Sequence, residues 1–169
     1  MTVAVRKIAT GESPRDAVRA LLFETVKNEL SLEMDERDIV KDERGKPFDK
    51  KGRFFVSLSH SGGVCAILVA DTPCGVDVQE IKSVSDGVLK KIGVLPPFPE
   101  SDRERTALWA LAESFVKMTG DGISALSKVP HFKNINIKNE FTKVASDSDE
   151  LFEIKEICGY VLAVCVHTA

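Results

Sequence analysis

The spacing of hydrophobic residues predicts two long amphipathic helices. The first begins at Ser13 and Pro14, a pair typical of a helix N-cap followed by proline at the first helical position. Hydrophobic residues then recur every three or four positions, at Ala17, Leu21, Leu22, Val26 and Leu30. A second helix is predicted over residues 101–118, and Gly120 follows it as expected at a helix end. Its apolar stripe consists of Leu108, Leu111, Ala112 and Phe115.

Elsewhere the pattern changes to that of β-strands. Residues 54–59 alternate between apolar and polar side chains, whereas residues 64–70 form a continuous apolar run, as in a strand buried on both faces. Residues 75–79 alternate again, which places Asp77 and Gln79 on one face of a strand. Further strands are predicted over residues 132–137, 151–157 and 160–166. This mixture of periods predicts an α+β fold.

Two segments interrupt these patterns. Residues 41–47 are charged and contain Gly45 and Pro47, which predicts a loop. Residues 83–100 lack a clear period and contain several prolines, so we expect a loop or linker there.

A weak internal repeat suggests how the chain is organised. Residues 63–70 resemble residues 159–166 in their apolar pattern, and a helix and strands occur in each part of the chain. We therefore predict two similar halves, residues 1–83 and 84–169, within one compact domain.

Composition and charge narrow the functional classes. The 169 residues carry 23 basic and 26 acidic side chains, a net charge of −3, whereas a general nucleic-acid binder normally has a basic excess. The N-terminus has no apolar segment typical of a signal peptide, and the longest apolar runs are too short to cross a bilayer. We expect a cytoplasmic protein that binds neither nucleic acid nor membrane.

Three short segments carry candidate chemistry. Ser59 and His60 precede a pair of glycines at a strand end, where hydroxyls, imidazole and backbone amides suit a phosphate. Asp77 is an acid presented from a strand, and Glu113 and Lys117 lie four residues apart on the second predicted helix. Each segment has a simpler interpretation: the first can be a polar turn, and the last a surface ion pair.

Taken together, the three segments predict a magnesium and phosphate site. Asp77 and Glu113 could share a Mg²⁺ ion, which prefers oxygen ligands and often binds substrate phosphates as well. His60, Lys46 and Lys117 would then supply donors or positive charge to those phosphates.

These motifs, in this order, resemble those of the 4′-phosphopantetheinyl transferase superfamily. The similarity is closest to its Sfp-like branch, in which two related halves form a pseudo-dimer within one chain. The segments that carry it are GKP at 45–47, FVSLSHSG at 55–62, GVDVQ at 75–79 and WALAESFVK at 109–117. The resemblance extends over residues 15–166 and implies that fold, with its two α+β halves related by a pseudo-twofold axis.

The resemblance implies an activity and its partners. The protein would transfer the 4′-phosphopantetheine arm of coenzyme A to a serine of an apo acyl or peptidyl carrier protein and release 3′,5′-ADP. Such carriers belong to fatty-acid, polyketide or nonribosomal peptide biosynthesis. Mg²⁺ would be the cofactor and coenzyme A the co-substrate. Two halves in one chain would allow the protein to act as a monomer.

The resemblance also implies residue roles. Asp77 and Glu113 would bind the metal, with Glu113 as a possible general base, and Asp77, Glu113 and Lys117 would be the catalytic set. Lys117 would contact the pyrophosphate and assist the leaving group. The remaining coenzyme A contacts would come from Arg19, Lys46, Ser59 and His60.

Two positions depart from the family pattern. Gln79 replaces the second acid of the strand motif; its amide oxygen can still bind Mg²⁺, directly or through water, but adds no charge. Ala112 stands where the helix motif has a lysine before the glutamate. These departures keep open the alternative of a catalytically weak relative that binds coenzyme A or a carrier protein without efficient transfer. An unrelated α+β domain with coincidental motifs is a further alternative.

Overall fold

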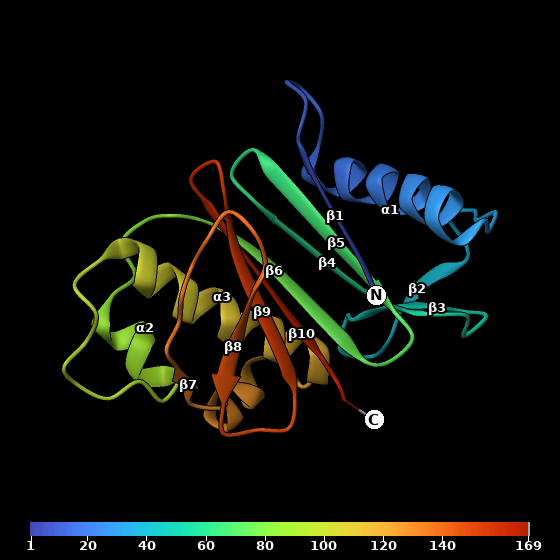
Figure 1. Cartoon of the computed structure of the whole chain (residues 1–169). Helices are drawn as coiled ribbons and strands as arrows, with labels where there is room; N and C mark the ends of the chain where they lie inside the picture. The colour runs from blue at the N-terminus through green and yellow to red at the C-terminus, as the bar shows by residue number, and fades with distance from the viewer. Residues whose placement is uncertain (169) are drawn as a thin grey trace.

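The computed structural model describes residues 1–168 and, for Ile123, the backbone only; Figure 1 shows its arrangement. The helices are α1 (Pro14–Leu30), α2 (Asp86–Lys91) and α3 (Asp102–Thr119), and a short 3₁₀ helix, η1, spans Gly122–Lys128. The strands are β1 (Thr2–Lys7), β2 (Ile39–Lys41), β3 (Pro47–Asp49), β4 (Phe55–Ser61), β5 (Val64–Ala70), β6 (Cys74–Glu80), β7 (Phe132–Lys133), β8 (Thr142–Ser146), β9 (Leu151–Ile157) and β10 (Tyr160–Val166).

The strands form two main sheets and a two-stranded ribbon. One sheet has the order β1-β5-β4, the other has the order β6-β10-β9-β8-β7, and β2 pairs with β3. Adjacent strands are antiparallel in each of these pairings. Helix α1 lies beside the first sheet and α3 beside the second (Figure 1). The α+β fold predicted from the sequence is confirmed.

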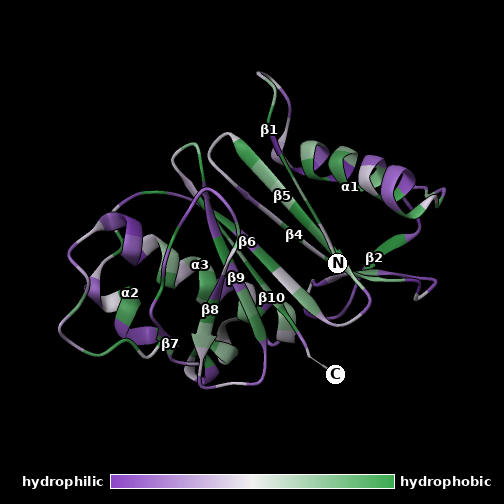
Figure 2. Cartoon of the chain, in the orientation of Figure 1, coloured by the Kyte–Doolittle hydropathy of each residue, from purple (hydrophilic) through white to green (hydrophobic). Residues whose placement is uncertain are grey.

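Within the described residues, the core consists of four hydrophobic clusters, and the central strands contribute to more than one of them. Leu22 of α1 packs in one cluster with Ile67 of β5, and Leu111 of α3 packs in another with β9 and β10. Since successive strand residues point to opposite faces, Leu68 of β5 enters a third cluster, where it joins Val76 of β6. The continuous hydrophobic colour of β5 in Figure 2 reflects this burial on both faces. None of the helices in residues 1–168 is long and apolar enough to span a membrane.

Most predicted elements lie where the sequence pattern placed them. Helix α1 begins after Ser13, whose Oγ accepts a hydrogen bond from the Asp16 amide at 3.1 Å. Helix α3 ends at Gly120, which adopts the left-handed conformation (φ 75°) and donates its amide to the Val116 carbonyl. Strands β4, β5, β6, β9 and β10 match the predicted runs to within two residues at either end.

Two local predictions were wrong, and one strand was missed. The region 83–100 contains helix α2, whose six residues are too few to give a recognisable helical period. The strand predicted over 132–137 is only two residues long, and β8 was missed because Val144 is its one buried residue. The loop predicted over 41–47 is confirmed for residues 42–46, which connect β2 to β3.

The second half of the predicted division shares a sheet with the first. Strand β6 lies within residues 1–83, yet its hydrogen-bonded neighbour is β10, near the C-terminus. The two-half organisation and its pseudo-twofold axis stay predictions.

Helix α3 packs unusually closely on β6. A Cβ atom placed on Gly75 would lie 1.9 Å from the Ser114 carbonyl oxygen and 2.6 Å from the Met118 amide nitrogen. Only a glycine at this position lets the helix backbone approach the strand so closely. This contact brings Glu113 and Lys117 of α3 to the strand that carries Asp77.

Candidate active site

Asp77 is the centre of a buried polar network. The residue is 2% exposed, and its Oδ1 accepts hydrogen bonds from Lys117 Nζ at 2.6 Å and from Ser59 Oγ at 2.8 Å. Its Oδ2 accepts a hydrogen bond from Gln79 Nε2 at 2.8 Å. A buried carboxylate is costly unless it is paired and hydrogen-bonded, and here both oxygens have donors and one has a cation.

Ser59 connects this network to the backbone of the acidic strand. Besides donating to Asp77, its Oγ accepts hydrogen bonds from the Val78 amide at 3.2 Å and from Lys117 Nζ at 3.0 Å. One donor and two acceptor positions are all that a hydroxyl offers. The hydroxyl of Ser59 is therefore fully engaged and holds Asp77 and Lys117 in fixed positions.

Glu113 lies one helical turn before Lys117 on α3 and is half-buried. Burial raises the pKa of its carboxyl group, the nearby Asp77 carboxylate raises it further, and Lys117 acts in the opposite direction. Two carboxylates close enough to repel each other favour binding of a shared proton or cation. A glutamate with a raised pKa also suits proton transfer near neutral pH.

A cavity of about 460 Å³ opens beside this network, and we call it the cationic cavity. Three of the predicted coenzyme A contacts line it: Ser59 and His60 of β4 and Arg19 of α1. Arg15 and Lys41 also line it. The apolar part of the wall consists of Val18, Leu22, Phe23, Ile39, Pro47 and Leu58. Several positive side chains around a partly apolar pocket suit a phosphorylated ligand with an apolar or aromatic part.

Lys46 lies outside the lining of the cationic cavity. Its Nζ donates to the Met118 carbonyl at 2.5 Å, at the C-terminal end of α3, where a cation is favoured by the helix dipole. Burial lowers the pKa of Lys46. Together with Lys117 it lines a smaller cavity of about 260 Å³, which shares Pro47 and Leu58 with the cationic cavity. Lys46 and Lys117 thus line a cavity that adjoins the cationic cavity at Pro47 and Leu58.

The oxygen atoms near Asp77 are suitable ligands for a hard divalent cation. Asp77 and Glu113 provide carboxylate oxygens, and the Gln79 amide nitrogen donates to Asp77, which leaves its amide oxygen as an acceptor. Within residues 1–168, no three His, Cys, Asp or Glu side chains gather as a metal-binding group. Protein ligands for a metal here would thus be two acids and one amide, a set compatible with Mg²⁺, which keeps several waters and binds substrate phosphates.

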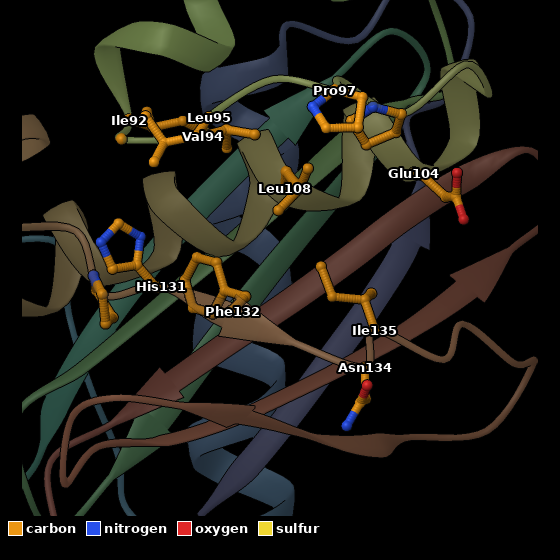
Figure 3. Close-up of a pocket in the computed structure, with 13 residues that line it drawn as sticks. Ile92, Val94, Leu95, Pro97, Glu104, Leu108, His131, Phe132, Asn134 and Ile135 are labelled. Carbon is orange, nitrogen blue, oxygen red and sulfur yellow. The ribbon is translucent and has the colours of Figure 1, made fainter.

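A separate, mainly apolar cavity of about 390 Å³ lies at the other end of α3 (Figure 3). Leu108 and Glu104 of α3 line it together with Phe132, His131 and residues of the segment after α2. None of the predicted site residues belongs to its lining. The predicted residues Ser59 and His60 on β4, Asp77 on β6, and Glu113 and Lys117 on α3 therefore lie away from this cavity.

Two cationic-cavity residues were missing from the predicted set. Arg15 was detectable, because it lies four residues before Arg19 and so on the same side of the helix. Lys41 gave no signal, since it ends a three-residue strand that the sequence pattern did not reveal.

Fold and site together place a cavity lined by several positive side chains next to the carboxylates of Asp77 and Glu113. No family model matches the chain. A 4′-phosphopantetheinyl transferase of Bacillus pumilus, psf-1, is 30% identical over 139 residues, which cover 72% of this chain and 60% of that protein. With the four ordered motifs, this similarity shows that the chain belongs to the 4′-phosphopantetheinyl transferase superfamily. The aligned region is shorter than two thirds of the relative's own length.

Proposed function

We propose that this protein transfers the 4′-phosphopantetheine arm of coenzyme A to a serine of an apo acyl or peptidyl carrier protein, releasing 3′,5′-ADP. The observation that carries the proposal is that Ser59 belongs both to the cavity wall and to the hydrogen-bond network of Asp77. This residue lines the cationic cavity and also holds the Asp77 carboxylate by a 2.8 Å hydrogen bond. A phosphate bound in the cavity would therefore lie close to the acids, as a metal-assisted phosphoryl-type transfer requires.

In this proposal the cationic cavity holds the nucleotide end of coenzyme A. Arg19 and His60 contact its phosphates, and Arg15 and Lys41 add positive charge to the lining. Lys46 and Lys117 reach the pyrophosphate from the adjoining smaller cavity. Each of these donors offsets phosphate charge, and charge-assisted hydrogen bonds of this kind are stronger than neutral ones.

We assign the metal to Asp77, Gln79 and Glu113, with Mg²⁺ supplying neutralisation of pyrophosphate charge when it is bound. The serine oxygen of the carrier protein forms a bond to the phosphorus that bears the pantetheine arm, and the bond from that phosphorus to the 3′,5′-ADP oxygen breaks. Glu113 accepts the serine proton, a role that its raised pKa supports. Lys117 Nζ stabilises the negative charge that develops on the leaving oxygen.

The alternative of a weak relative that binds without transfer has less support. Its basis in the sequence is Gln79 and Ala112. Gln79 retains a polar role, since it donates to Asp77. Ala112 is completely buried and packs in an apolar cluster with Leu108 and Val116, where a lysine would be poorly accommodated. Ala112 is thus explained by packing and needs no loss of function.

The test is intact-mass spectrometry of apo carrier proteins incubated with this protein, coenzyme A and Mg²⁺. We expect the carrier to gain one phosphopantetheine. Glu113→Gln should reduce the rate by a factor of about 10² to 10⁴, the usual contribution of a general base, and Glu29→Gln, an exposed glutamate of α1, should have no effect. Full activity of Glu113→Gln would reject its assignment as base. Binding of coenzyme A without modification of any carrier would favour the non-catalytic alternative.

A further inference from the structure

Strands β4 and β6 lie next to each other without backbone pairing. β4 forms its ladder with β5, and β6 forms its ladder with β10. Throughout residues 1–168, no backbone ladder joins β4 to β6. Three serine hydroxyls of β4 span the boundary instead, each accepting a hydrogen bond from a backbone amide of β6. Ser57 accepts from Val76 at 3.0 Å, Ser59 from Val78 at 3.2 Å, and Ser61 from Glu80 at 3.1 Å.

We call this boundary the serine seam, defined by Ser57, Ser59 and Ser61. Each serine is 19 residues from its partner amide, so the two strands run in the same direction and stay in register. Successive strand residues point to opposite faces, and the three serines occupy alternate positions on β4. They therefore share one face and form a row of hydroxyls where a backbone ladder would otherwise stand.

The serine seam fixes the distance between the two parts of the proposed site. His60 of the cationic cavity lies on β4 between two seam serines. Asp77 lies on β6 between Val76 and Val78, whose amides Ser57 and Ser59 hold. Any change in the spacing of the seam would move the acid relative to the phosphate-binding side chains.

We propose that Ser57 is a positioning residue that sets the placement of Asp77 relative to the cationic cavity. This inference rests on the proposed function. Ser57 is 3% exposed and acts through the Val76 amide, one residue before Asp77. A ligand that touches both β4 and the metal-binding acids depends on Ser57, whereas a ligand held by the cationic cavity alone does not.

The first measurement tests the seam without reference to any activity. In Ser57→Ala, the Val76 amide loses its acceptor, and its hydrogen exchange should accelerate about tenfold, as expected for loss of one buried hydrogen bond. Ser57→Thr retains the hydroxyl and should restore slow exchange. Thr25→Val removes a buried hydroxyl that donates to the Leu21 carbonyl within α1, and it should leave Val76 unchanged. Unchanged exchange of Val76 in Ser57→Ala would overturn the proposal.

The second measurement compares two probes by calorimetry. Ser57→Ala should weaken binding of coenzyme A with Mg²⁺ about tenfold. It should change binding of metal-free 3′,5′-ADP, which lacks the second phosphate of the pyrophosphate and the pantetheine arm, by less than about twofold. Equal losses for both probes would show a general structural effect and overturn the positioning role. Failure of the unaltered protein to bind coenzyme A would overturn the proposed function itself, while the exchange of Val76 would still decide whether the seam exists.

Discussion

Replacing Gly75 with alanine should separate α3 from β6. The added Cβ would meet the Ser114 carbonyl oxygen at 1.9 Å and the Met118 amide nitrogen at 2.6 Å, both of them backbone atoms. A side chain could rotate away from such a clash, but a helix backbone has to move as a unit. Ordinary contact begins at 3.4 Å, so the helix has to retreat by about 1.5 Å.

The magnitude follows from that displacement. Overpacking a well-filled core usually costs about 1–3 kcal/mol, and backbone contacts this short place Gly75→Ala at or beyond the upper end. We expect the free energy of unfolding to fall by about 3 kcal/mol or more. The same shift moves Glu113 and Lys117 away from Asp77, and misplacement by about 1 Å can cost about a hundredfold in rate. Stability and transfer should therefore fall together.

The assay is urea unfolding followed by the fluorescence of Trp109, the single tryptophan in the sequence. The matched control is Gly63→Ala, because a Cβ at Gly63 would have no neighbour within 4 Å. That variant should stay within about 1 kcal/mol of the unaltered protein. If Gly75→Ala also stayed within about 1 kcal/mol, the close packing of α3 on β6 would be refuted.

Two further predictions concern charge. Gln79→Glu removes the 2.8 Å hydrogen bond to Asp77 and places a third carboxylate near Asp77 and Glu113. Calorimetric titration should show Mg²⁺ binding at least about tenfold tighter, and unchanged affinity would place Gln79 away from the metal. Asp49 is buried: burial alone would raise its pKa, but hydrogen bonds from Arg53 and its positive charge outweigh burial and lower the pKa below the ordinary 3.8. The stabilisation from this pair is therefore complete above about pH 4 and is lost as the pH falls through the lowered pKa. The free energy of unfolding of the unaltered protein and of Asp49→Asn, measured in urea from pH 5 downward, should therefore become more similar as the pH falls. A difference that stays constant with pH would contradict the lowered pKa of Asp49.

The sequence predicted well the elements that have a strong period of their own. Helix α1 has both an N-cap serine and a long apolar stripe, and β5 has an uninterrupted apolar run. Helix α2 and strand β8 escaped prediction because each has only one buried residue, Leu89 and Val144 respectively. Short elements of this kind are stabilised by tertiary contacts that a local pattern does not record.

The candidate site was predictable in its residue types but only partly in its contacts. Motif order brought Asp77, Glu113 and Lys117 into consideration, yet it assigned Ser59 to a phosphate and gave no hint that its hydroxyl is shared between Asp77 and Lys117. Nor did the pattern explain Gly75, since the need for glycine arises from its contact with Ser114 of α3, 39 residues further along the chain. Such requirements come from the packing of distant segments.

The ion pair between Lys117 and Asp77 couples the binding of a cation to the binding of an anion. Lys117 is a tethered counter-ion for the buried carboxylate of Asp77, with its Nζ 2.6 Å from Oδ1. A divalent cation approaching Asp77 competes with this ammonium group, and an anion approaching Lys117 competes with the carboxylate. A cation that binds Asp77 frees Lys117 for an anion, and an anion that binds Lys117 frees Asp77 for a cation. Such coupling is reciprocal. The site would therefore hold a cation and an anion together more readily than either one alone.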